Sequence, residues 1–165
     1  MGMPGPNVAW KSKTSWRAKL HKPKLPKLVP VPEGMAKRLG SGMMLIPTAL
    51  EVDAMVRKIP RGHVSSVAQI RRRLAHWHNA DVTCPLVTGI FLRIVAEAAE
   101  EDRVSGKPDI APYWRVLRED GGLHAKFPGG IDEQARRLME EGHTVVNGKV
   151  VAHPHGGNLD VKRSA

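Results

Sequence analysis

The sequence predicts a mainly α-helical domain with small β elements, of the winged helix-turn-helix type, carrying a basic disordered N-terminal arm. Three observations lead to this fold class. Apolar residues recur at helical spacing in three stretches, two of these stretches are separated by a short polar turn, and every strand signal is short. With 165 residues, the chain is long enough for one compact domain and too short for two ordinary ones.

The N-terminal segment differs in composition from the rest of the chain. Residues 1–40 hold nine Lys or Arg and one acid, together with many prolines. Such a segment buries too little apolar surface to offset its chain entropy. We therefore expect a disordered arm (1–40), a folded domain (41–152) and a flexible tail (153–165). Within the arm, Trp10 and Trp16 are expected either to stack on bases or to dock on the protein's own surface.

The three expected helices each follow a residue that caps a helix. Thr48 with Glu51 makes a capping box, and Ser66 with Gln69 makes a second one. Thr83 is the expected cap of the third helix. We expect these helices at about 48–58, 66–77 and 84–101, with the second and third forming a helix-turn-helix.

Short strands and one further helix are expected around this unit. Apolar runs predict strands at residues 43–46 and 114–118, and an Asn-Gly turn at 147–148 predicts a hairpin. The further helix is expected to begin at Asp132 as its cap and to be closed by Gly142.

The charge balance favours a polyanionic partner. Lys and Arg number 26 against 16 acids, which gives a net charge of +10 and a pI near 10.2. Residues 57–73 hold six of these cations and no acid, although any single run of charge is also compatible with a plain solvated surface. We expect DNA as the partner. The expected contact residues are basic or hydroxyl side chains: Arg61, Ser65, Ser66, Arg71, Arg72, Arg73 and Thr83.

Other features narrow the class of protein. Cys84 is the only cysteine, so no intrachain disulfide forms and a cytoplasmic location is expected, including association with a bacterial nucleoid. No signal peptide or membrane span is predicted. No cofactor is expected, and no metal site, because His153 and His155 lack a carboxylate or cysteine at suitable spacing.

Three sequence blocks in the expected domain occur in a recognisable order. Ile-Pro-Arg-Gly-His-Val-Ser-Ser-Val-Ala-Gln-Ile spans residues 59–70, and Ala-Pro-Tyr-Trp-Arg-Val spans 111–116, followed by a glycine-rich stretch at 120–131. A helical segment that ends in Glu-Gly follows at 136–142. Over residues 47–142, this order resembles the O6-alkylguanine-DNA alkyltransferase family.

The resemblance implies a helix-turn-helix that enters the minor groove and a pocket that receives a flipped guanine. The family's acceptor cysteine falls on Tyr113, whose phenol is a poor nucleophile, and its activating histidine falls on Trp114. Only Glu141 matches the acid of the family's catalytic set. The implied pocket residues are Val67, Tyr113, Trp114, Arg115, Gly129, Gly130 and Glu141.

The positions that flip the base also depart from the family. Its flipping tyrosine falls on Val67, and the arginine that fills the vacated stack falls near Leu86 or Val87. Tyr113 and Trp114 either line a retained base pocket as stacking platforms or pack in the core.

Three functions stay open at the level of sequence. The first is a non-catalytic DNA-binding module, which the family suggests could recognise alkylated DNA in repair. The second is an active methyltransferase that uses Cys84, since a helix start lowers the pKa of a thiol. The third is a protein-interaction domain that has lost DNA binding.

Overall fold

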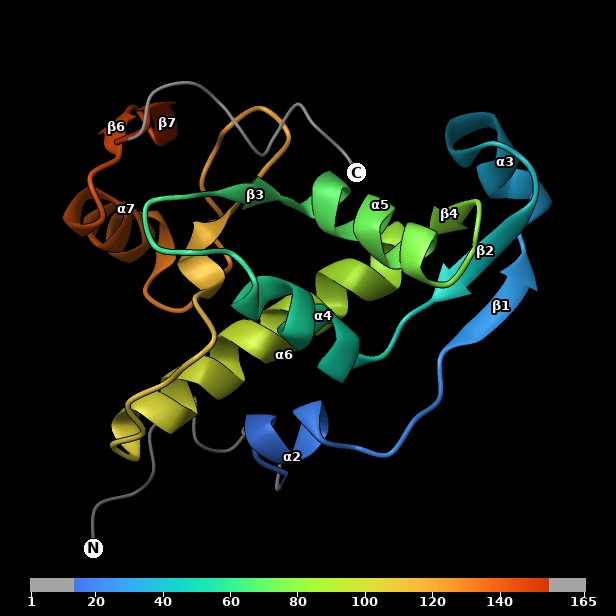
Figure 1. Ribbon diagram of the computed structural model, residues 1–165, viewed down its shortest axis with the longest axis horizontal. Helices are drawn as coiled ribbons and strands as arrows, with labels where there is room; N and C mark the ends of the chain where they lie inside the picture. Colours follow the sequence, from blue (N-terminus) through green and yellow to red (C-terminus); the bar gives the residue numbers. More distant parts are fainter. Residues whose placement is uncertain (1–13, 155–165) are drawn as a thin grey trace, which may run out of the picture.

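The computed structural model describes residues 14–154 and contains six helices in that range, three small sheets and one short 3-10 turn. The mainly helical fold class with small β elements is confirmed. Figure 1 shows the arrangement of these elements. The helices are α2 (Trp16–Leu20), α3 (Glu33–Leu39), α4 (Ala49–Arg57), α5 (Val67–Trp77), α6 (Pro85–Val104) and α7 (Gly130–Glu140). The strands are β1 (Lys27–Pro30), β2 (Met43–Ile46), β3 (Ser65–Ser66), β4 (Val82–Thr83), β5 (Val116–Leu117), β6 (Thr144–Val146) and β7 (Lys149–Ala152).

The long helix α6 crosses the centre of the molecule (Figure 1). Its buried face includes Leu92, Val95 and Ala96, each at most 3% exposed, and this apolar stripe packs against α2, α4 and α5. The same hydrophobic cluster includes Tyr113, which connects α6 to the 3-10 turn η1 (Tyr113–Arg115). The helix α7 and the β6-β7 hairpin lie at the end of the molecule opposite the β1-β2-β4 sheet.

The helix-turn-helix is formed by α5, the turn through β4, and α6. Thr48 makes the expected capping box with Glu51 at the start of α4, and the Ser66 hydroxyl accepts a hydrogen bond from the Gln69 amide at the start of α5. The predicted cap of the third helix is wrong. Cys84 is the N-cap of α6, and the Thr83 hydroxyl instead donates to the Arg71 carbonyl at 2.7 Å, because Thr83 belongs to strand β4.

The strands tie distant segments of the chain together. The expected strand at 43–46 is confirmed as β2, which pairs antiparallel with β1 and parallel with β4. The two-residue strands β3 and β5 pair in parallel, with Ser65 opposite Val116 and Ser66 opposite Leu117. This pairing brings the start of α5 beside the end of η1.

The expected strand at 114–118 is only half right. Its first half folds as η1, because the Arg115 amide donates to the Pro112 carbonyl in a tight turn, and only Val116–Leu117 is extended. The predicted cap Asp132 is also wrong, since α7 already begins at Gly130 with Gly129 as its N-cap.

Two turn predictions are confirmed. Asn147 and Gly148 adopt φ of 51° and 72°, the left-handed pair that a type I′ hairpin requires, between β6 and β7. Gly142 follows α7 with φ of 94°, as expected of a glycine that closes a helix.

The prediction of a disordered arm is wrong for residues 14–40. This segment forms α2, β1 and α3; Leu20 is 4% exposed in the main core and Trp16 packs against that core. The Arg17 guanidinium forms an ion pair with Asp102 of α6 at 2.7 Å. The composition of this segment, rich in proline and lysine, predicted that the cost in chain entropy would exceed the gain from burial. Burial of a few apolar residues against the apolar face of α6 offsets that cost.

The ends of the chain are only partly within the described range. Trp10 and most of the predicted tail lie outside residues 14–154, whereas Trp16 docks on the protein's own surface, one of its two expected fates. Within the described residues, no helix is both long and apolar enough to cross a membrane.

Candidate nucleic-acid interface and the pocket behind it

The arginines of α5 point in different directions. Consecutive residues of a helix are about 100° apart, so Arg71, Arg72 and Arg73 fan around the helix instead of forming one row. Arg72 is exposed, whereas Arg71 and Arg73 are half-buried. The Nε of Arg71 is buried and has no hydrogen-bond partner among the described residues. Arg72 is therefore the member of this run that is most free to reach a phosphate.

The three hydroxyl residues expected to contact DNA lie inside the domain. Ser65, Ser66 and Thr83 are at most 2% exposed. The Ser65 hydroxyl donates to Gln69 Oε1 at 3.1 Å, and the other two hydroxyls make the capping and strand contacts described above. Their expected role as DNA contacts is wrong, because the three buried hydroxyls are used in hydrogen bonds to residues of α5.

The charge around the helix-turn-helix is strongly one-sided. Residues 54–96 contain seven Lys or Arg and a single acid, Asp81. The Asp81 carboxylate accepts a hydrogen bond from the Met43 amide at 2.8 Å, so it is used within the fold. The acids of α6 lie in its second half and include Glu101, which accepts the Arg17 amide, and Asp102. The first half of α6 therefore lies in a basic region of the molecule.

The first half of α6 also exposes large apolar side chains. Leu86 and Ile90 are 69% and 52% exposed, and Val87 between them is half-buried. Leu86 or Val87 is where the resemblance expects an arginine. Leu86 and Ile90 therefore lie outside the core.

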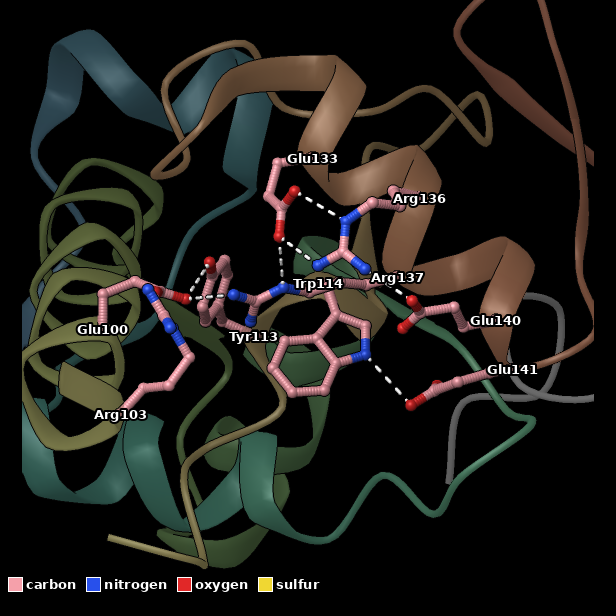
Figure 2. A network of polar contacts seen from close by, with 9 residues as sticks. All are labelled: Glu100, Arg103, Tyr113, Trp114, Glu133, Arg136, Arg137, Glu140 and Glu141. Carbon is pink, nitrogen blue, oxygen red and sulfur yellow. Dashed lines mark hydrogen bonds and ion pairs between the residues drawn. The ribbon is translucent and has the colours of Figure 1, made fainter. Parts of the chain in front are cut away.

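Behind this surface, Tyr113 is held in a buried polar network. Tyr113 is 1% exposed, and its hydroxyl donates to Glu100 Oε1 at 2.8 Å. Arg137 donates to the same oxygen at 2.6 Å, as Figure 2 shows. Burial and the hydrogen bond to Glu100 raise the pKa of Tyr113 above its ordinary value. Burial also acts to raise the pKa of Glu100, but hydrogen bonds from Arg103 and Tyr113 outweigh it and lower that pKa. Tyr113 is thus a neutral hydrogen-bond donor.

The neighbouring Trp114 is fixed by Glu141. The indole Nε1 donates a hydrogen bond to Glu141 Oε2 at 3.1 Å. The Arg115 guanidinium donates hydrogen bonds to both oxygens of that carboxylate, at 2.9 and 2.7 Å. Burial acts to raise the pKa of Glu141, but the hydrogen bonds from Arg115 and Trp114 outweigh it and lower that pKa. The guanidinium of Arg137 lies 4.7 Å from the Trp114 ring centre, within cation-π range. Arg115 is therefore structural, since its third contact goes to the Ile59 carbonyl at 2.7 Å.

Glycines place α7 against this network. Gly129 and Gly130 have φ of 79° and 71°, and a Cβ on Gly129 would lie 2.6 Å from the Cβ of Glu133. The tight turn lets the buried Gln134 donate to the carbonyls of Trp114 and Val116. Within α7, Arg137 donates a hydrogen bond of 2.9 Å to Glu133, which lies one turn earlier. The hydrogen bonds from Arg136 and Arg137 lower the pKa of Glu133 to about 2, so its carboxylate stays charged.

An open hollow of about 360 Å³ lies beside Trp114 and α7. Its lining combines arginines and glutamates that already pair with each other: Arg61, Arg103, Ile110, Trp114, Glu133, Arg136, Arg137, Glu140 and Glu141. Tyr113 is not among these lining residues. The hollow offers no cysteine and no other activated nucleophile. Among the described residues, no group of three metal-binding side chains is close enough to hold a metal ion.

Cys84 lies far from this pocket. It is the N-cap of α6 and is 5% exposed, whereas Glu100, the partner of Tyr113, lies sixteen residues further along the same helix. At 1.5 Å per residue, this separation is about 24 Å. The Cys84 thiol is also buried. The backbone carbonyl of Cys84 accepts a hydrogen bond from the Thr88 hydroxyl at 2.7 Å. The structure therefore does not bring Cys84 to the site that the resemblance implies.

Comparison with known families decides the ancestry. The family model described as "6-O-methylguanine DNA methyltransferase, DNA binding domain" matches residues 47–143, more than half of the chain. The chain belongs to this family of DNA-binding domains. Comparison with curated proteins and with solved structures gave no match.

Within the methyltransferase DNA-binding domain, the match covers α4, α5, α6, η1 and α7, so the helix-turn-helix and the pocket both belong to it. The site residues predicted from sequence divide into two groups. The structure brings together Tyr113, Trp114, Arg115 and Glu141, but Val67 packs in a half-buried position on the main core at the start of α5.

Sequence reasoning missed the partners that occupy the pocket. Glu100, Arg103 and Arg137 complete the network, yet on the sequence they look like ordinary surface charges of two helices. A signal was available in Arg137, because it lies one turn after Glu133 and follows the matched glycine-rich stretch. Glu100 carried no comparable signal, since its role depends on where η1 packs.

Proposed function

We propose that this chain is a DNA-binding module that does not transfer alkyl groups. The observation that supports the proposal best is the state of the acceptor position, where the hydroxyl of a buried Tyr113 donates a hydrogen bond to the Glu100 carboxylate at 2.8 Å. Alkyl transfer requires a thiolate-like nucleophile beside a base. A phenol whose pKa is raised by burial stays protonated, and a protonated phenol is a poor nucleophile.

We infer that the chain has lost base flipping together with alkyl transfer. A flipped guanine needs an empty pocket and aromatic or polar partners for its edges. Here the Trp114 indole, held by Glu141, and the Arg137 guanidinium fill the space beside Tyr113. We infer that the chain binds the duplex from outside, through phosphates and groove contacts, and that recognition of O6-alkylguanine, if present, does not use an extruded base. Residence in the cytoplasm, in contact with the nucleoid, fits such a role.

No observation supports an enzyme whose alkyl acceptor has moved to Cys84. The thiol of Cys84 is covered and is separated from the Tyr113 network by about 24 Å of helix. An enzyme at Cys84 would need a second base-binding pocket near the start of α6.

The decisive experiment measures binding and chemistry on the same sample. Fluorescence anisotropy of the full chain is recorded with duplexes that do or do not contain one O6-methylguanine, across a salt series, and the protein mass is then determined. We expect salt-dependent binding to both duplexes, with log K falling linearly against log salt, and no mass gain. A methyl adduct on Cys84 would establish an enzyme. Absence of binding at low salt would leave a protein-interaction domain and refute the proposal.

A matched pair of variants separates specific contacts from general charge. Arg72→Ala removes the exposed arginine of α5, whereas Arg136→Ala removes an exposed arginine of α7 that pairs with Glu133 and Glu140. We expect the salt slope to fall by about one for Arg72→Ala and to stay unchanged for Arg136→Ala.

A further inference from the structure

The segment that precedes the family-matched residues adds a small helix beside the helix-turn-helix. Residues 27–46 run as strand β1, helix α3 and strand β2, and the family match begins only at residue 47. Strand β2 pairs in parallel with β4, the strand inside the turn between α5 and α6. Figure 1 shows α3 at the end of the molecule where β2, β4 and the end of α5 meet. We call residues 27–46 the α3 hairpin.

The α3 hairpin is tied to the helix-turn-helix along β2. The Asp81 carboxylate accepts a hydrogen bond from the Met43 amide at 2.8 Å, and the Asp81 amide donates to the Met43 carbonyl at 3.0 Å. Gly42 has φ of 117°, and a Cβ at this position would overlap the Asp81 carboxylate, so the chain leaves α3 in close contact with the turn. Further along β2, the Cys84 amide at the start of α6 donates to the Leu45 carbonyl at 2.9 Å. These contacts give α3 a fixed place beside the helix-turn-helix.

The outer face of α3 is open to solvent. None of the side chains of this helix is buried. Gly34, Lys37 and Arg38 are exposed, and they share one face because they are three and four positions apart. A Cβ on Gly34 would meet no atom within 4 Å. This face therefore adds nothing to the core and is accessible to a partner.

The cations of the α3 hairpin are not neutralised within the fold. Residues 14–50 hold seven Lys or Arg and one acid. Lys27, Lys37 and Arg38 are exposed, and within residues 14–154 none of the three has an ion-pair partner. Arg136 of α7, by contrast, is exposed and pairs with two glutamates. Unpaired cations that are held in place are suited to phosphates, because they neutralise them without first breaking a contact of their own.

We propose that the α3 hairpin is a second phosphate-binding surface, which holds the DNA backbone next to the part of the duplex that the helix-turn-helix contacts. This inference rests on the proposed DNA binding and adds to it a surface outside the family-matched residues. Phosphate contacts from elements beside a helix-turn-helix fix its position on the duplex. The start of α6 lies at the level of Leu45, three residues or about 10 Å along β2 from Gly42. This separation is about three phosphates along one DNA strand.

The charge of the outer face of α3 can be changed without removing any contact. Gly34→Glu places a carboxylate beside Lys37 and Arg38, whereas Gly34→Gln adds a side chain of the same size without charge, and both side chains have room. Binding of the full chain to a duplex is measured by fluorescence anisotropy across a salt series. We expect Gly34→Glu to bind more weakly, with a salt slope smaller by about one, and Gly34→Gln to bind like wild type.

A second set of variants removes the cations themselves. The double variant Lys37→Ala/Arg38→Ala should lower the salt slope by about two. The matched control, Lys107→Ala/Arg136→Ala, removes the same net charge from cations that pair with acids, and should leave the slope unchanged. Adding Arg72→Ala to the first double variant should lower the slope by about three in total, because both surfaces contact the same duplex at once. Thermal melts verify that each variant folds, which is expected because the substituted residues are exposed.

The outcomes distinguish this proposal from the function on which it rests. If the wild-type chain binds with a salt-dependent affinity but Gly34→Glu and Gly34→Gln bind alike, or if the two double variants have equal slopes, the second surface is refuted and DNA binding stands. A triple variant whose slope equals that of Arg72→Ala alone would also refute it, because α3 would then add no phosphate contact. If the wild-type chain does not bind DNA, both proposals fail.

Discussion

The ion pair between Glu141 and Arg115 is the feature whose removal we expect to cost the fold most. The Glu141 side chain is 3% exposed and accepts two hydrogen bonds from Arg115 and one from Trp114. In Glu141→Gln, the shape is kept but the charge is lost, so the Arg115 guanidinium, 13% exposed, stays buried without its counter-ion. Breaking a buried pair in this way costs about 3 kcal/mol or more.

The assay is urea and thermal unfolding of the full chain. For a domain of this size, each kcal/mol shifts Tm by roughly 2–4 °C, so we expect Glu141→Gln to lower Tm by roughly 6–12 °C. The control is Glu140→Gln, which removes the adjacent carboxylate; its side chain is 59% exposed and pairs with Arg136 at the surface. This control should leave Tm within experimental error. Equal Tm values for the two variants would refute the claim that the Glu141 contacts stabilise the pocket.

Three further predictions concern the acceptor position, acid and the N-terminal segment. Tyr113→Cys should gain no methyl adduct by mass spectrometry after incubation with O6-methylguanine DNA, because Trp114 stands where an activating base is needed; an adduct would show that the pocket still admits the base. Burial lowers the pKa of His143 to about 4, so the folded state favours the neutral ring: its contribution to stability is complete above the ordinary value near 6.5 and is lost as pH falls towards about 4. His143→Gln should flatten the unfolding free energy over that range, and an unchanged pH profile would contradict this assignment. Removal of residues 1–40 should lower Tm, because Leu20 is buried and its loss alone is worth about 2 kcal/mol; a Tm equal to that of the full chain would mean that α2 adds nothing to the core.

The sequence predicted the elements whose signals are local. The capping box at Thr48 and the Asn147-Gly148 turn each depend on residues within four positions, and both are confirmed; of the capping box expected at Ser66, the structure shows the hydroxyl cap. The same local reading failed at Thr83, because its backbone pairs with β2, almost forty residues earlier in the chain. Capping preference is worth about 1 kcal/mol and is easily overridden by such pairing.

The prediction of a disordered N-terminal segment was wrong for a related reason. Composition describes the average residue, whereas docking of α2 depends on a few: Trp16 and Leu20 meet the apolar side of α6, and Arg17 meets Asp102. These contacts span about 85 positions in sequence, so no window of composition or periodicity contains them.

The candidate site shows the same division. The ordered blocks identified the pocket and the change at Tyr113, but not the carboxylate that holds its hydroxyl. Glu100 reaches Tyr113 only after α6 and η1 have packed. The exposure of the Leu86 side chain likewise depends on which face of α6 the other helices cover. Periodicity shows that a helix has an apolar face; it does not say how much of that face remains in water.

The short parallel ladder between β3 and β5 has an optical consequence. Its two rungs join the residues just before α5 to those just after η1, so α5 and the turn that carries Trp114 are braced by the same pair of backbone segments. We therefore expect a tilt of α5 on binding to change the environment of the Trp114 indole. With its other tryptophans replaced by phenylalanine, the protein should report its own binding through a change in Trp114 emission, without any label on the nucleic acid.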